Sequence, residues 1–214
     1  FQITQEYLGF SNHLAYLAPL FSECLSSDTY CDGVGSTVAS VPDGSLKLFP
    51  VTALAGVAHI GEDVNWKGHH FAQATWYALG PLTWDYPLTP AGIAREWIAQ
   101  TFTADERCSE PVAEMMLSSR ETVVDYMMPL GLHHIFAWDH HYGPEPWTYI
   151  PGARADWLPS YYHRADQAGL GFDRTKTGSD AVSQYFPPLD TVFNDPELCP
   201  EEYLLWFHHA AWNR

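Results

Sequence analysis

A near-continuous apolar run from Leu54 to Gly61 constrains the fold of this chain more than any other feature. Such a run fits a β-strand that is buried on both faces, as strands of a parallel barrel are. Residues 1–9 predict a second strand, because apolar and polar side chains alternate there with a period of two. Between the two strands, residues 12–27 carry apolar side chains at helical spacing, although Pro19 predicts a late start or a bend. The first part of the chain therefore reads as strand, helix and strand.

A long irregular connection is expected over residues 28–50, which are rich in glycine and proline. From residue 71 onward the pattern becomes helical. The spacing predicts a helix over residues 71–80 that a glycine closes, and a second helix that begins at Thr89-Pro90 with a capping hydroxyl and a proline in its first turn. A third helix is predicted over residues 109–128, capped by Ser109.

The expected buried side chains of the second and third helices are Ile93, Trp97, Ile98, Phe102, Val112, Met115, Met116, Val123 and Met127. The methionines are interpreted as core packing. Ordered loops are expected over residues 140–171, and a helix over residues 179–193 that Pro187-Pro188 interrupts. A last helix should begin at Pro200.

The charge of the chain excludes several classes of partner. With 26 acidic against 10 basic residues the formal net charge is −16, which repels nucleic-acid backbones and anionic membrane surfaces. No apolar run approaches the roughly 18 residues of a membrane span. Aromatic residues make up 15% of the chain, enough for a compact core and for stacking on sugar rings. Because the chain opens with Phe inside a strand, we expect its natural amino terminus to lie upstream.

Metal and cofactor motifs are absent from the sequence. The cysteines are spread through the chain without a C-x-x-C pair and are interpreted as free thiols, with a Cys24–Cys31 bridge as the alternative. Four histidine doublets begin at residues 69, 133, 140 and 208. Adjacent side chains diverge, so packed or hydrogen-bonded histidines are the default, and a composite metal site is the alternative. No phosphate loop, nucleophile elbow or EF-hand occurs, so we expect neither metal nor cofactor.

Glu6 is the candidate catalytic residue. It stands at the end of the first predicted strand, and in a parallel α/β barrel the loops at that end build the active site. A single glutamate near a strand end is more often simply solvated, so position alone does not assign it a role. The exit of the second strand, residues 62–70, is expected on the same face as Glu6.

Long motifs resemble those of glycoside hydrolase family 67, the α-glucuronidases of xylan breakdown. The matching stretches are QITQEYLG at 2–9, DTYCDGVGS at 28–36, AGVAHIGEDVNWKGHHFAQATWYALGPLTW at 55–84, PLGLHHI at 129–135, HYGP at 141–144, RADW at 154–157, YYHRAD at 161–166, GFDRT at 171–175 and CPEEYLLWFHH at 199–209. The chain departs from the family pattern at His59, Lys67 and Thr75. His59 and Lys67 fall near the exit of the second strand and could alter the rim of a site there.

The resemblance implies a fold class that is α/β and then mainly α. It implies that residues 1–70 form the carboxyl-terminal part of a (β/α)8 TIM-barrel catalytic domain, contributing its last two strands. It also implies that residues 71–214 form a mostly helical carboxyl-terminal domain. Two strands cannot close a barrel, so we expect the isolated chain to be inactive and poorly folded, with exposed strand edges.

The resemblance further implies an inverting hydrolase for the α-1,2 bond between (4-O-methyl)glucuronic acid and xylose of xylo-oligosaccharides. In that mechanism Glu6 matches a carboxylate on the side that activates water, while the general acid and a partner aspartate belong to earlier barrel strands. Trp157 is the candidate substrate-binding residue, with a structural role in its loop as an equal alternative. Homodimerisation through the helical domain and a cytoplasmic location, with secretion as the alternative, are also expected. A non-catalytic carbohydrate-binding or dimerisation domain is the competing interpretation.

Overall fold

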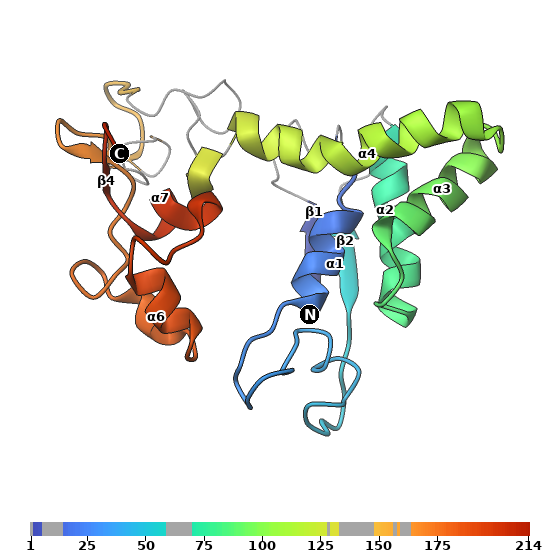
Figure 1. The fold of residues 1–214 in the computed structure, drawn as a ribbon, viewed down its shortest axis with the longest axis horizontal. Coiled ribbons are helices and arrows are strands. Elements are labelled where there is room, and N and C mark those ends of the chain that lie inside the picture. Colours follow the sequence, from blue (N-terminus) through green and yellow to red (C-terminus); the bar gives the residue numbers. More distant parts are fainter. Residues whose placement is uncertain are drawn as a thin grey trace. The chain divides into compact units, whose positions relative to one another are not determined.

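The structure is a computed structural model, and it describes residues 2–5, 15–58, 70–127, 129–132, 148–155, 158 and 164–214, with the backbone alone at 2–5, 58, 126 and 127. Helices predominate in this part of the chain (Figure 1). The chain divides into two compact units, Phe1–Val123 and Val124–Arg214, and their boundary in the sequence falls within one helix. The predicted boundary after residue 70 separates a barrel domain from a helical domain, which is not the division into compact units, and it stays a prediction.

Unit 1, residues 1–123, contains two short strands and four helices among its described residues. Their bounds are β1 Gln2–Gln5, α1 Ala18–Ser26, β2 Ala55–Ala58, α2 His70–Trp84, α3 Pro90–Thr101 and α4 Glu106–Met127, whose last four residues fall in unit 2. Unit 2, residues 124–214, contains η2 Pro129–Gly131, β3 Gly169–Leu170, η4 Ala181–Gln184, α6 Leu189–Asn194, η5 Glu201–Tyr203, α7 Leu204–Phe207 and β4 Ala210–Ala211.

The two predicted strands pair with each other in parallel. Gln2 is aligned with Ala55 and Gln5 with Ala58, so the carboxyl ends of β1 and β2 lie at the same edge of the sheet. Parallel neighbours need a crossover connection, and α1 lies within the connection that joins these two strands. The prediction of strand, helix and strand is therefore confirmed.

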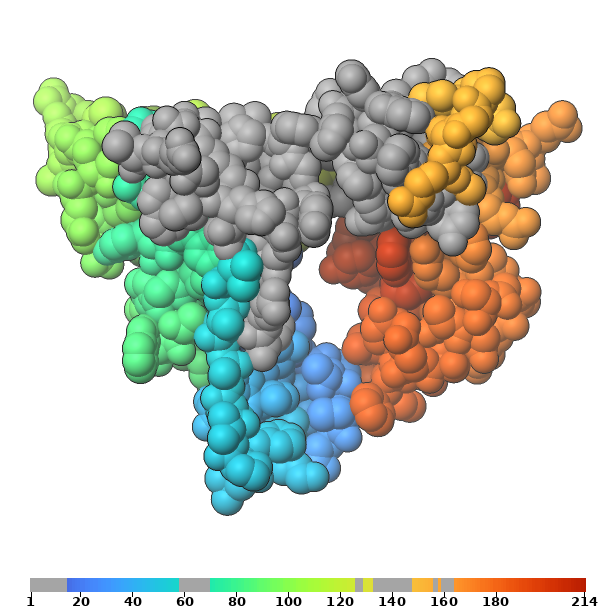
Figure 2. All heavy atoms as spheres, turned by 180° about the vertical axis from the view of Figure 1, so that it is seen from behind, coloured from blue at the N-terminus to red at the C-terminus, as the bar shows by residue number. Residues whose placement is uncertain are grey.

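One face of β2 is covered closely by α2. A Cβ atom at Gly56 would lie 2.2 Å from the ring of Trp76 and 2.3 Å from a methyl group of Leu79, so glycine permits this approach of helix and sheet. Val57, whose side chain projects to the other face, is 41% exposed. Residues 45–58 run along the surface of unit 1 (Figure 2). Ala55 and Gly56 are also exposed, so the expectation of a strand buried on both faces is not met in this chain, although α2 approaches one face closely.

The predicted start is right for α3, the late start is the correct alternative for α1, and the predicted end is wrong for α2. Helix α1 begins late, with Pro19 in its first turn, and α3 begins at Pro90 with the Thr89 hydroxyl accepting a hydrogen bond from the Gly92 N–H at 3.1 Å. Helix α2 continues through Gly80 to Trp84. Burial of Leu79 and Leu82 on either side of Gly80 outweighs the cost of a glycine and a proline inside the helix.

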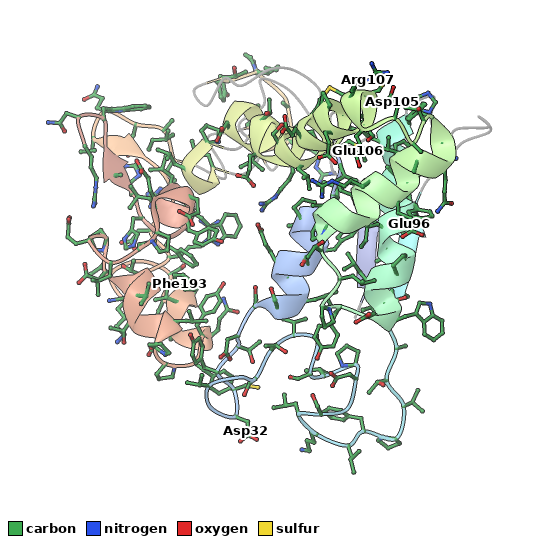
Figure 3. The ribbon with its side chains drawn as sticks, turned by 45° about the vertical axis from the view of Figure 1, so that its right-hand side comes forward. Asp32, Glu96, Asp105, Glu106, Arg107 and Phe193 are labelled. Atoms are coloured by element: carbon green, nitrogen blue, oxygen red, sulfur yellow. The ribbon has the colours of Figure 1, made fainter. Side chains whose placement is uncertain are left out.

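Helix α4 begins three residues before the predicted start. The Asp105 carboxylate accepts a hydrogen bond from the Arg107 N–H at 3.1 Å, which is the contact that a helix cap makes, whereas Ser109 lies inside the helix. Asp105, Glu106 and Arg107 stand together at this end of α4 (Figure 3). Two expected core residues are also exposed, Phe102 by 53% and Met115 by 56%.

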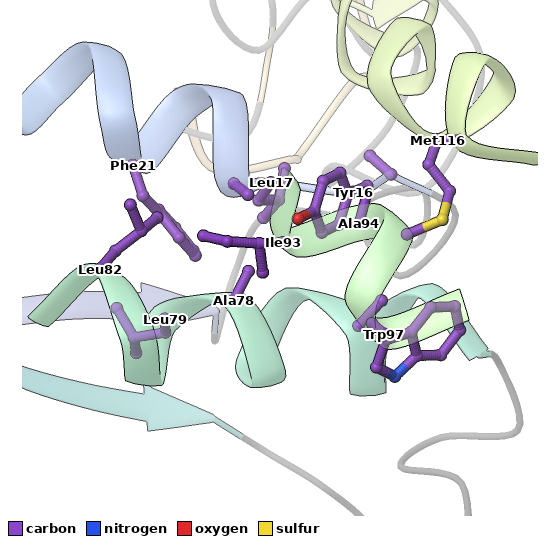
Figure 4. Close-up of a cluster of buried hydrophobic side chains, with 14 of the residues drawn as sticks. Tyr16, Leu17, Phe21, Ala78, Leu79, Leu82, Ile93, Ala94, Trp97 and Met116 are labelled. Atoms are coloured by element: carbon purple, nitrogen blue, oxygen red, sulfur yellow. The ribbon is translucent and has the colours of Figure 1, made fainter. Parts of the chain in front are cut away.

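The core of unit 1 lies between α1, α2, α3 and α4 (Figure 4). Its largest fully buried side chain is Tyr16, which precedes α1 and whose hydroxyl donates to the Pro90 carbonyl at 3.0 Å. Burial, with a smaller contribution from Tyr77, raises the pKa of Tyr16 well above its usual value. The buried Thr75 of α2 serves the same segment, since its hydroxyl accepts from the Leu17 N–H at 3.1 Å and donates to the Ala15 carbonyl at 3.3 Å.

Unit 2 contains the short antiparallel pair of β3 and β4. Gly171, directly after β3, has φ +103°, and a Cβ atom there would lie 2.2 Å from the His208 carbonyl oxygen, so only glycine fits. The predicted interruption at Pro187-Pro188 is confirmed, because η4 ends before it and α6 begins after it. The predicted last helix is divided into η5 and α7 and ends at Phe207.

Replacing Thr75 with valine should destabilise the protein by about 2 to 4 kcal/mol, because it leaves a buried N–H and a buried carbonyl without a partner while preserving side-chain shape. Urea denaturation measures the change. Thr122→Val, at an exposed position of α4, is the matched control and should change the free energy of unfolding by less than about 0.5 kcal/mol. Equal effects of the two substitutions would show that the buried hydroxyl is not needed.

Candidate functional site

The carboxyl-terminal edge of the β1–β2 sheet is the position where sequence and structure place a candidate active site. Gln5 and Ala58 end the two strands side by side, and residues 6 and 59 follow them in the chain. Ligands of parallel α/β sheets bind outside the carboxyl ends of the strands. The segment after β2 leads directly into α2, which begins at His70.

Both residues predicted to act on the substrate lie outside the described residues. Glu6 is the residue after the last one of β1, and Trp157 stands between Ala155 and the buried Leu158, which are described. The structure therefore fixes the strand that precedes Glu6 but supplies no side-chain geometry for either residue. The roles of Glu6 and Trp157 stay predictions.

An apolar hollow of about 790 Å³ lies among α2, α3 and α4 in unit 1. His70 and Phe102 contribute to its wall and contact each other edge to face, with ring centres 5.2 Å apart. The exposed thiol of Cys108 and the side chain of Met115 also line it. Such a lining suits apolar groups and offers few hydrogen-bond partners to a sugar.

A smaller hollow of about 410 Å³ lies beside residues 52–54, at the amino-terminal end of β2, and includes Asp43 in its wall. Hydrogen bonds from Ser45, with a smaller contribution from Tyr86, hold the pKa of this carboxyl below its usual value. Its position is opposite to the edge where active sites of parallel sheets form, so we assign no catalytic role to it.

Unit 2 contains a cluster of two guanidinium groups and two aromatic rings, Arg164, Phe172, Arg174 and Trp206. The Arg174 guanidinium carbon lies over the Trp206 ring, 3.9 Å from its centre, and 5.0 Å from the centre of the Phe172 ring. Arg164 lies over the same Phe172 ring at 5.8 Å. Arg174 also donates a hydrogen bond to the Trp206 carbonyl. The arrangement can bind a planar anion and stack on the face of a sugar.

The loop after Phe172 is held by its own side chains. The Asp173 carboxylate accepts hydrogen bonds from the Thr175 hydroxyl at 2.7 Å and the Thr177 hydroxyl at 2.8 Å. These bonds lower the pKa of Asp173 against the opposing effect of partial burial. The lone pairs of this carboxylate are thus committed to the loop, which sets the backbone that carries Arg174.

The last histidine doublet has two different environments. His208 is 8% exposed and its Nε2 atom has no hydrogen-bond partner in the described part of the chain, and burial lowers its pKa, which favours the neutral ring. His209 lies between two acceptors, with Nδ1 2.6 Å from the Gly171 carbonyl and Nε2 3.2 Å from Asp166 Oδ1. It can donate to both only as an imidazolium. Packing and hydrogen bonding of this doublet are confirmed.

The described residues hold no group of three or more His, Cys, Asp or Glu side chains that could bind a metal ion. All four cysteines are free thiols, so the alternative of a Cys24–Cys31 bridge is wrong. Within the described ranges, no helix combines the length and the apolar character that a membrane crossing requires.

Sequence reasoning missed the guanidinium cluster of unit 2. Its members fall within the matched stretches YYHRAD, GFDRT and CPEEYLLWFHH, but nothing in their spacing along the chain indicates that they meet. The only signal was weak and compositional, since arginines are few in so acidic a chain and both arginines of the cluster lie two residues after an aromatic residue, Tyr162 or Phe172.

The fold is that of an α/β protein with a mainly helical carboxyl-terminal part. Its two strands pair in parallel, a helix follows each strand, and the remainder is largely helical. Two family descriptions match the chain: "Glycosyl hydrolase family 67 middle domain" over residues 1–66 and "Glycosyl hydrolase family 67 C-terminus" over residues 67–214. The chain belongs to glycosyl hydrolase family 67, as the sequence motifs predicted.

Curated relatives agree with this assignment. The chain is 33% identical over 215 residues to the "Probable alpha-glucuronidase A" of Aspergillus clavatus, covering 100% of this chain and 25% of that protein. It is 33% identical over 213 residues to the protein of the same name from Aspergillus oryzae, covering 99% and 25%. It is 32% identical over 215 residues to "Alpha-glucuronidase A" of Emericella nidulans, covering 100% and 25%. The chain thus spans about a quarter of the length of these relatives.

The Asp166 carboxylate should make the stability of unit 2 sensitive to acid. Hydrogen bonds from the backbone N–H groups of Gly169 and Ala168, and the neighbouring His209, lower its pKa. A carboxyl whose pKa is lower in the folded than in the unfolded protein stabilises the fold. This stabilisation is complete at a pH above the unfolded-state pKa of about 4, and it is lost as the pH falls through the folded-state pKa. Urea midpoints measured from neutral pH downward should therefore fall more steeply for the wild type than for Asp166→Asn. Parallel curves for the two proteins would exclude this role.

Proposed function

We propose that this chain is the carboxyl-terminal part of an α-glucuronidase that removes glucuronic acid, or its 4-O-methyl ether, from xylo-oligosaccharides. The observation that carries the proposal is the match to both family 67 descriptions along the whole chain, together with a glutamate placed directly after the parallel strand β1. The names of the relatives support the activity, and their greater length supports the view that other parts of the enzyme complete the site.

The strands β1 and β2 are proposed as the last two strands of a (β/α)8 barrel. Three features support this assignment: the strands are parallel, a helix follows each of them, and α2 packs tightly on β2 at Gly56. The exposed Val57 suits a face that the remaining barrel strands would enclose. In that arrangement the carboxyl ends of β1 and β2 point to the catalytic face.

Glu6 acts on the water molecule in this proposal. An inverting hydrolase needs a carboxylic acid that protonates the leaving xylan oxygen and a carboxylate that deprotonates water on the opposite face of the sugar, roughly 6.5–9.5 Å away. Glu6 takes the second role together with a partner aspartate, and the acid comes from an earlier strand. A strand end holds such a carboxylate more rigidly than a loop does, which keeps the space for one water molecule.

Two further properties of the whole protein belong to this proposal. Homodimerisation through the helical region fits the exposed apolar side chains of unit 2, among them Phe186, Leu198 and Tyr203. A concentration-independent monomer in light scattering would exclude homodimerisation.

A cytoplasmic location suits free thiols such as the exposed Cys31, whereas secretion is the alternative. Cell fractionation decides between them.

Replacing Glu6 with glutamine in the full-length enzyme should lower kcat by roughly 10² to 10⁴-fold while KM changes little, because the substitution removes the proton acceptor and keeps the shape. Steady-state kinetics on a glucuronic-acid-substituted xylo-oligosaccharide measures it. Glu114→Gln, on the exposed side of α4, is the matched control and should leave kcat unchanged. Proton NMR of the first product should show the β-anomer. A normal kcat would remove Glu6 from the mechanism, and the α-anomer would exclude inversion.

Replacing Trp157 with alanine should raise KM or lower kcat without changing the melting temperature if the indole packs against the sugar or its 4-O-methyl group. The competing role, packing within its own loop, predicts a lower melting temperature instead. Measuring kinetics and thermal unfolding on the same preparation separates the two. Trp84→Ala, at a position that is 90% exposed on α2, is the control and should affect neither quantity.

A further inference from the structure

The guanidinium cluster of unit 2 differs from four other arginines of the described part in how its charges are compensated. Four arginines of the described part each form an ion pair with a carboxylate, namely Arg95 with Glu110, Arg107 with Asp105, Arg120 with Glu23 and Arg214 with Glu197. In the described ranges Arg164 and Arg174 have no carboxylate partner, and aromatic rings face them instead. Two cations beside one ring repel each other, so the cluster attracts an anion.

The carboxylates that lie nearest in sequence are committed elsewhere. Asp166 accepts hydrogen bonds from two backbone N–H groups of its own turn and faces His209. Asp173 accepts from the hydroxyl groups of Thr175 and Thr177. Each of these carboxylates therefore satisfies a local turn, and in the described part neither forms an ion pair with a guanidinium of the cluster.

Arg174 is partly buried, and this burial lowers the pKa of its guanidinium because the charge is desolvated without a carboxylate to offset it. One of its N–H groups donates to the Trp206 carbonyl, which leaves further donors on the planar fork. Arg164 has φ +43°, a left-handed backbone conformation that is strained for a residue with a side chain. Strain of this kind is retained where the surrounding structure holds a side chain in place for function.

We propose that Arg164 and Arg174, with the rings of Phe172 and Trp206, form a binding subsite for the carboxylate of an acidic saccharide. The guanidinium groups would bind the uronate carboxylate, and the aromatic surface would pack against the sugar ring or its xylose neighbours. The identity of the saccharide, a glucuronic-acid-substituted xylo-oligosaccharide, rests on the proposed function. The carboxylate preference rests only on the cluster.

The test measures binding to the full-length protein that carries Glu6→Gln, so that no ligand is hydrolysed. Isothermal titration calorimetry compares xylotetraose bearing one 4-O-methylglucuronic acid with unsubstituted xylotetraose. Arg164→Gln and Arg174→Gln should each weaken binding of the acidic ligand about tenfold and leave the neutral ligand unchanged. Arg107→Gln, which removes the same charge from an exposed arginine in unit 1, is the matched control and should change neither.

A local measurement complements the titration. Phenylglyoxal modifies accessible guanidinium groups, and mass spectrometry reports the modification at each arginine. The acidic oligosaccharide should protect Arg164, whereas the neutral one should not. Unchanged affinity in both variants, equal losses for the two ligands, or equal protection by both would overturn the proposal. Arg164 is exposed, so Arg164→Gln decides the matter even if Arg174→Gln fails to fold. Absence of turnover by the wild type would instead exclude the proposed function and leave this result standing.

Discussion

The structure of unit 1 depends on how residues 15–17 satisfy their backbone polar groups. These residues precede α1, whose Phe21 N–H donates to the Leu17 carbonyl at 3.0 Å, but the N–H groups of Tyr16 and Leu17 need partners from other helices because the side chains of this segment are buried in the core. Thr75 of α2 bonds to Ala15 and Leu17, and the Ser119 hydroxyl of α4 accepts from the Tyr16 N–H at 2.9 Å. Helices α2 and α4, which are far apart from this segment in the sequence, are thereby both hydrogen-bonded to residues 15–17. At Thr75, where the chain departs from the family pattern, one hydroxyl serves as both donor and acceptor.

This anchoring extends to the edge of the sheet where Glu6 follows β1. Gly56 lets α2 approach β2, and α2 in turn holds the segment before α1. The connection that contains Glu6 therefore begins at a paired strand and ends at a buried, hydrogen-bonded segment. The proposed catalytic role of Glu6 requires both its strand and the return of its chain to be fixed, and the described residues supply these two supports.

Local rules predicted the elements whose boundaries depend on local interactions. The prolines at positions 19 and 90 favour helix starts because they lack an N–H group, and the Thr89 hydroxyl caps the second of these helices. Both effects can be recognised from the sequence. The rules failed where tertiary burial or a competing cap decided the outcome. Leu79 and Leu82 carry α2 past Gly80, and Asp105 caps α4 ahead of Ser109.

The exposed side chains of Phe102 and Met115 show a similar limit, because helical spacing identifies an apolar face but not whether another element covers it. The candidate catalytic residue came from a motif that resembles a family, since one glutamate at a strand end carries little information by itself. The guanidinium cluster came from the structure alone. Arg164 and Trp206 are separated by a long stretch of chain, and only the fold brings both next to residues 172–174.

This chain carries a formal net charge of −16, so an acidic sugar that binds to it, as proposed, meets electrostatic repulsion from its carboxylates. At physiological ionic strength the screening length is about 8 Å, so distant carboxylates contribute little and the nearest charges determine the sign of the local potential. Arginines that form ion pairs cannot provide a positive potential, because their partners cancel it. Guanidinium groups held by aromatic rings keep their charge available at short range, while the net charge of this chain still disfavours polyanionic partners. For the proposed recognition of an acidic saccharide, the placement of Arg164 and Arg174, which have no carboxylate partner among the described residues, therefore matters more than the overall excess of carboxylates does.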